Sequence, residues 1–135
     1  MEKQNIIQIM HEDLSNAPEL LRDCLAILNY ICSQPKQNLR HITFGALSRA
    51  ANLPNIQDVI PASRYLMGAR VTLLTAKFEF VEDDFNEDIS LEDVSEARKE
   101  GVFYHPDKGE PVENFESKLF MYFSINSEAQ NLCNE

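Results

Sequence analysis

A run of acidic side chains at residues 82–88 is the first segment of this chain whose residue types could do chemistry. Clustered carboxylate oxygens are the ligands that Ca²⁺ prefers. The run lacks the alternating ligands, the central glycine and the closing glutamate of an EF-hand loop. We therefore expect a solvated loop at this position and no metal site.

The cysteines, histidines and glycines give no pattern for catalysis either. Cys24 and Cys32 fall within a helical pattern and are expected to be small, reduced core residues, while Cys133 has no base beside it to activate its thiol. The three histidines lie far apart and no pair has the H-x-x-x-H spacing of a metal site. With only four glycines and no G-x-G-x-x-G motif, a phosphate-binding loop is not indicated. We expect no enzyme activity and no cofactor.

Charge is distributed unevenly along the chain. The net charge is −10, yet residues 1–81 hold eight basic and seven acidic side chains, whereas residues 82–135 hold four basic and fifteen acidic ones. Residues 36–77 contain six basic side chains and a single acidic one, Asp58. Because Lys and Arg supply most non-specific affinity for phosphates, this stretch is the part of the chain suited to nucleic acid.

Three helices are expected before the first strand. Apolar residues recur at three- and four-residue intervals over residues 18–33, with Pro18 in the first turn. Thr43 is expected to cap a second helix over residues 44–51. Asp58 is expected to cap a third helix over residues 59–68, which ends at Gly68.

Two strands are expected in the second half, because large apolar and β-branched residues alternate over residues 70–81 and 118–125. Each has a strongly apolar face, so we expect the two to lie adjacent and antiparallel. The acidic insertion between them, residues 82–116, is expected to hold a helix over residues 91–100 and an exposed loop at residues 105–111.

The order of these elements resembles the winged helix-turn-helix superfamily. The resemblance is carried by TFGALSRAANLP at residues 43–54 and continues through Met67, with small residues where two helices cross and a polar turn after them. It implies an α+β fold with a three-helix core and a two- or three-stranded antiparallel wing carrying an acidic insertion. The expected division is an N-terminal arm at 1–14, a winged-helix domain at 15–126 and a flexible tail at 127–135.

The resemblance implies that the third helix enters the major groove of duplex DNA. Arg64 is then the candidate for a bidentate contact to guanine, and Tyr65 for a phosphate or stacking contact. The full set of expected DNA-binding residues is Gln57, Ser63, Arg64, Tyr65, Arg49, Arg70 and Lys77.

These features predict a winged-helix DNA-binding protein, in the manner of a transcriptional regulator, with a protein partner for the acidic C-terminal half. The alternatives are an acidic protein-binding adaptor or assembly subunit, or a DNA mimic, neither with affinity for DNA. We expect a cytoplasmic protein, because the chain shows no membrane span and no secretory signal. A homodimer through the apolar stretch at residues 6–10 is also expected.

Overall fold

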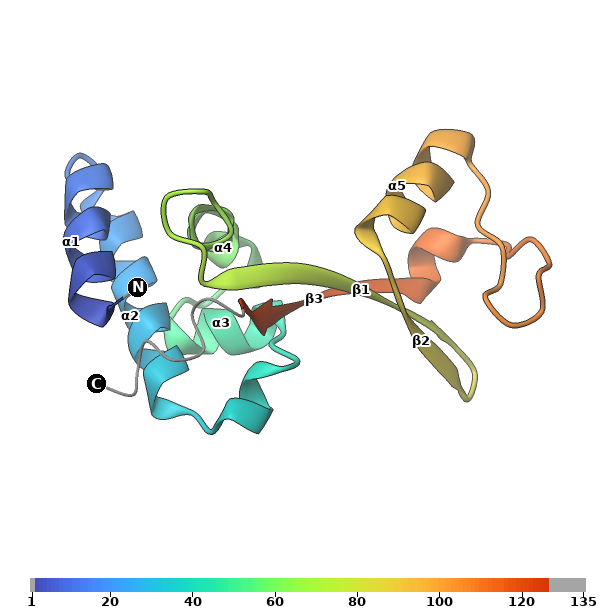
Figure 1. Ribbon diagram of the computed structural model, residues 1–135, viewed down its shortest axis with the longest axis horizontal. Helices are drawn as coiled ribbons and strands as arrows, with labels where there is room; N and C mark the ends of the chain where they lie inside the picture. The colour runs from blue at the N-terminus through green and yellow to red at the C-terminus, as the bar shows by residue number, and fades with distance from the viewer. Residues whose placement is uncertain (1, 127–135) are drawn as a thin grey trace. The chain divides into compact units, whose positions relative to one another are not determined.

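The computed structural model describes residues 2–126, which form two compact units. The first, here called the helical unit, comprises residues up to Thr75 together with residues 123–126. The second, here called the acidic unit, is Ala76–Tyr122. Strands β1 (Leu74–Glu82) and β3 (Leu119–Ile125) each contribute residues to both units (Figure 1).

The helical unit is built around α2 (Pro18–Ser33), whose bounds match the expectation. The proline occupies the first turn, where its missing N–H costs nothing, and the apolar stripe places Cys24, Ile27, Leu28 and Ile31 in the core. Figure 1 shows α1 (Lys3–Asp13) beside α2. Because Ile6 and Met10 of α1 are buried in this monomer, that part of the expected dimerisation surface is not exposed.

The residues expected as an N-terminal arm thus include a helix packed on the core.

Burial of the Cys24 thiol raises its pKa to about 12, as expected for an inert core residue. Cys32 is disulfide-bonded, so the expectation of a reduced thiol is wrong for this residue. The expected flexible tail at 127–135 lies outside the described residues.

The next two helices lie close to their expected positions, but only the first has the expected N-terminal cap. The Thr43 side chain accepts a hydrogen bond from the Ala46 N–H and caps α3 (Phe44–Ala50), as expected. Asp58 does not cap the following helix, because it lies inside a 3₁₀ turn, η2 (Ile56–Val59), that leads directly into α4 (Ile60–Leu66). Another 3₁₀ turn, η1 (Lys36–Leu39), precedes α3.

A three-stranded antiparallel sheet follows, in the order β2-β1-β3, so the adjacency expected for the two long strands is confirmed. The fold is therefore α+β, as predicted. The expectation of a solvated loop at residues 82–88 is wrong, because this segment forms the turn of a hairpin between β1 and β2 (Phe85–Ile89) and most of β2 itself. Asp83 takes the left-handed conformation, with φ 51°, that a two-residue hairpin turn requires.

The acidic unit has a small core of its own under α5 (Leu91–Glu100), whose bounds match the expectation. Phe85 and Ile89 lie four residues apart on one face of β2 and pack against this core, which explains why so acidic a segment forms a strand. A final 3₁₀ turn, η3 (Phe115–Lys118), leads into β3. The buried residues of the core are Phe78, Phe80, Val94, Ala97, Phe103 and Leu119.

None of the helices in residues 2–126 is both long enough and apolar enough to cross a membrane.

Candidate functional site

Three of the expected DNA-binding residues are exposed on the helical unit. Gln57 lies in η2, Arg64 in α4 and Arg49 in α3, and all three side chains are open to solvent. Ser63 is different, because it is only 1% exposed and its hydroxyl donates a hydrogen bond to the Ile60 carbonyl oxygen. In this conformation Ser63 offers no surface to a ligand.

Two further members of the set are engaged with a carboxylate of α1. The Tyr65 hydroxyl donates to Asp13 Oδ2 at 2.7 Å, and the Arg70 guanidinium donates to both carboxylate oxygens at 2.9 and 3.3 Å. These hydrogen bonds lower the pKa of Asp13, while burial and the bond to Asp13 raise the pKa of Tyr65. The cluster ties the end of α1 to residues at and beyond α4.

Lys77, the last member of the set, is exposed on β1 within the acidic unit, whereas the other six lie in the helical unit.

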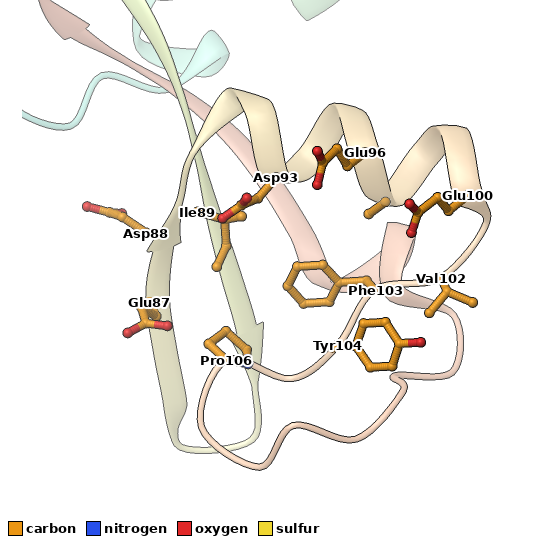
Figure 2. A pocket seen from close by; sticks show the side chains of 11 residues that line it. Glu87, Asp88, Ile89, Asp93, Glu96, Glu100, Val102, Phe103, Tyr104 and Pro106 are labelled. Carbon is orange, nitrogen blue, oxygen red and sulfur yellow. The ribbon is translucent and has the colours of Figure 1, made fainter.

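A groove of about 480 Å³ lies in the acidic unit and combines charge with exposed apolar surface (Figure 2). We call it the acidic groove. It is bordered by the end of β2, one side of α5 and the segment that follows α5. Its lining residues are Glu87, Asp88, Ile89, Asp93, Glu96, Ala97, Glu100, Val102, Phe103, Tyr104 and Pro106.

The rim of the acidic groove is a row of carboxylates along α5. Asp93, Glu96 and Glu100 are spaced by three and four residues, which places them on one side of the helix. Figure 2 shows the three side chains following one another along that side, with the Phe103 ring lying below them in the view. Glu87 adds a fourth carboxylate from β2.

These rim carboxylates have no basic partner among the described residues. The ion pairs of the acidic unit are elsewhere: Arg98 pairs with Glu116 at 2.8 Å, and Lys118 with Glu82 at 2.7 Å. The unit holds fourteen acidic and five basic side chains, a net charge of −9. A cation that enters the acidic groove therefore meets negative charge that no residue of the described chain neutralises.

Asp88 plays a separate role at the edge of the acidic groove. Its side chain points away from Phe103 in Figure 2 and accepts a hydrogen bond from the Tyr122 hydroxyl at 2.9 Å. Burial, together with this bond, raises the pKa of Tyr122 to about 12. Asp88 thus joins β2 to β3 across the sheet.

The floor of the acidic groove is apolar and partly open to water. Phe103 belongs to the core and is 6% exposed, whereas Val102 and Tyr104 beside it are 36% and 56% exposed. Both are among the few large apolar side chains that the described chain leaves open. Exposed apolar surface next to charge is a common property of binding sites.

Local interactions hold the two walls in place. The Ser90 hydroxyl caps α5 by accepting a hydrogen bond from the Asp93 N–H at 3.1 Å. The helix ends at Gly101, whose φ of 78° turns the chain back toward the groove floor. Beyond it, the buried ring of His105 accepts hydrogen bonds at Nδ1 from the backbone N–H groups of Asp107 and Lys108, both at 3.1 Å.

The lining of the acidic groove consists of acidic, aliphatic and aromatic side chains. Its lining includes no histidine, cysteine, serine or lysine. Over residues 2–126 there is also no cluster of three or more His, Cys, Asp or Glu side chains arranged to hold a metal ion. What the groove provides is negative charge above an aromatic and aliphatic floor.

Sequence reasoning did not identify these residues, although part of the signal was available. The helix over 91–100 was predicted, so the common side of Asp93, Glu96 and Glu100 follows from their spacing alone. The contribution of Glu87 cannot be predicted from spacing, because it depends on the hairpin that brings β2 next to α5.

Comparison of the chain with protein-family models, curated proteins and solved structures finds no match in any of the three.

Proposed function

We propose that this protein is a non-enzymatic binding module whose acidic groove binds a positively charged segment of a partner protein. The observation that carries the proposal is the row of unpaired carboxylates beside the exposed apolar side chains of Val102 and Tyr104. This interpretation corresponds to the protein-binding adaptor considered from the sequence.

Lysine and arginine side chains match both features of the acidic groove. Their methylene stems pack on apolar surface while the charged end remains near water. A stem lying on Val102 and Tyr104 would bring its ammonium or guanidinium group toward the α5 carboxylates. The ring of Tyr104 also favours a cation above its face.

The proposal is tested with an array of twelve-residue peptides that differ in the number and position of Lys and Arg. The best binder is then titrated calorimetrically against the protein and against the triple variant Asp93→Asn, Glu96→Gln, Glu100→Gln. A partly exposed ion pair contributes about 0.2–1 kcal/mol, so the loss of three should reduce affinity by about tenfold. Affinity should also fall as salt is added.

A matched control separates the acidic groove from general charge. The variant Glu92→Gln, Glu110→Gln, Glu113→Gln removes three exposed carboxylates that do not line the groove. It should bind the peptide within about twofold of the parent protein, because the change in net charge acts from a distance and is screened. Equal losses in the two variants, or no binding of any basic peptide at low salt, would refute the proposal.

A DNA mimic is a special case of the same arrangement, in which the basic partner is itself a nucleic-acid-binding protein. The α5 row supports it, since helical rise separates Asp93, Glu96 and Glu100 by about 4.5 and 6 Å along the axis. A competition experiment distinguishes a DNA mimic from a general binder of basic segments. Duplex DNA should displace this protein from the partner only if the partner binds DNA and this protein through the same surface.

A second candidate function is winged-helix DNA binding through the helical unit. It is supported by the order of α2, α3 and α4 before an antiparallel ribbon, and by the exposure of Arg49, Gln57 and Arg64. Arg64→Ala should then weaken binding to a preferred duplex by about 1–3 kcal/mol and reduce the preference over random duplex.

Lys77→Ala should instead weaken binding to both duplexes equally and lower the salt slope of log affinity by about one. The absence of any complex with mixed-sequence DNA at low salt would eliminate this candidate.

A further inference from the structure

We propose that the partner segment binds the acidic groove as an extended strand added to the free edge of β2, with basic side chains at every second position. This inference rests on the proposed function and specifies the form of the partner. It depends on the position of β2 in the sheet, on the place of the acidic groove and on the charges along this edge.

The position of β2 leaves one of its edges unpaired among the described strands. The sheet order is β2-β1-β3, and β2 pairs with β1 over its whole length, from Glu82↔Phe85 to Phe78↔Ile89. In an antiparallel ladder, alternate residues use their N–H and C=O groups toward the same neighbour. Every second residue of β2 therefore directs these groups outward, where an added strand can pair with them.

Residues of this same strand line the acidic groove. Glu87, Asp88 and Ile89 of β2 line it together with residues of α5. A strand paired to β2 would run about 4.8 Å from it. Its side chains would point alternately to the two faces of the sheet, so every second one would lie on the same face as Glu87 and Ile89, which line the groove.

The charges around the acidic groove support basic residues at those positions. The groove is lined by Glu87 of β2 and by the α5 row of Asp93, Glu96 and Glu100. None of these carboxylates has a basic partner among the described residues, so basic side chains of an added strand would be attracted to them. The side chains on the other face have no such requirement.

The same charges argue against a second copy of this chain as the occupant. Pairing of two β2 strands would place Glu87 and Asp88 of one copy close to the equivalent carboxylates of the other. Like charges opposite one another destabilise a sheet, and charged edges are a known defence against self-pairing. A basic strand converts this repulsion into attraction, so charge complementarity selects that partner.

The first test uses two synthetic twelve-residue peptides of equal composition. One alternates lysine and threonine, and places every lysine on one face of a strand. The other repeats Lys-Lys-Thr-Thr and divides the lysines between the faces. The alternating peptide should bind the full-length protein at least tenfold more tightly by calorimetry, and equal affinities would overturn the strand geometry.

The second test examines the backbone pairing directly. Two methylated versions of the alternating peptide are compared. In one, the backbone amide nitrogen of every lysine carries a methyl group, and in the other, the backbone amide nitrogen of every threonine does. Because alternate N–H groups face opposite edges of a strand, one version should lose at least tenfold in affinity and the other less than threefold. Losses that are equal in the two versions overturn the inference.

Amide hydrogen exchange of the protein gives an independent readout. Bound alternating peptide should slow exchange at alternate residues of β2. Unchanged exchange along β2 in the saturated complex overturns strand addition. If neither synthetic peptide binds while a peptide from the array still does, the strand inference fails alone; if no basic peptide binds, the proposed function fails with it.

Discussion

The turn that supports the floor of the acidic groove should depend on two separate properties of His105. The ring is 4% exposed, accepts two backbone hydrogen bonds at Nδ1, and packs against Phe80 and Phe85 with centroid distances of 5.3 and 4.6 Å. His105→Phe keeps an aromatic ring but removes the acceptor. His105→Asn keeps an acceptor at a similar distance from the backbone but removes the ring.

The magnitudes follow from these contacts. Each hydrogen bond contributes about 0.5–1.5 kcal/mol, so His105→Phe should lower the free energy of unfolding by about 1–3 kcal/mol. Each aromatic contact contributes about 0.5–1.5 kcal/mol beyond its buried area, so His105→Asn should cost a similar amount or slightly more. Urea denaturation followed by circular dichroism measures both values.

Amide exchange distinguishes the two causes. In His105→Phe, the N–H groups of Asp107 and Lys108 should exchange faster than in the parent protein, because they have lost their acceptor. In His105→Asn, exchange at these two groups should change much less. Parental exchange rates at both groups in His105→Phe would show that Nδ1 is not their acceptor and would refute this reasoning.

Three further predictions concern charge and backbone conformation. The folded pKa of Asp13 is lowered by hydrogen bonds from Arg70 and Tyr65, so its carboxylate stabilises the fold above the ordinary value of 3.8, and this contribution is lost as the pH falls below that value. The stability difference between the parent and Asp13→Asn should therefore shrink on acidification from about pH 5 to about pH 2, and a constant difference would contradict the assignment. Lys118→Met should raise the pKa of Glu82, which the bond to Lys118 holds low, as carbon-detected NMR titration of the carboxyl would show; an unchanged value would exclude this pair in solution. Gly101→Ala should destabilise the protein by about 1 kcal/mol through its left-handed backbone alone, because no atom lies within 4 Å of the added methyl group, and an unchanged urea midpoint would argue against that conformation.

Much of the fold followed from local sequence signals. Pro18 at the start and an apolar stripe with a period near 3.6 residues define α2, and Ser90 with Gly101 define both ends of α5. These signals operate within a few residues, so they can be read without a structure. The two long strands were predicted for the same reason, because each carries its own apolar face.

Other features depended on residues far apart in the chain. The segment 82–88 looks like a solvated acidic loop by composition, and becomes a hairpin because Phe85 and Ile89 find a core that α5 and β3 complete. Tyr65 and Arg70 were named from the sequence as candidate DNA contacts, and the structure shows that both donate hydrogen bonds to Asp13, which is 52 and 57 residues away. A local pattern shows that a side chain is polar, but not which distant group will be its partner.

The candidate site illustrates the same division. The sequence determined the acidic row, since the spacing of Asp93, Glu96 and Glu100 fixes their common side once α5 forms. Only the tertiary structure placed that row beside Glu87 of β2 and the exposed side chains of Val102 and Tyr104. A binding groove requires surfaces from several segments at once, and their meeting is decided by burial of the shared core rather than by any one segment.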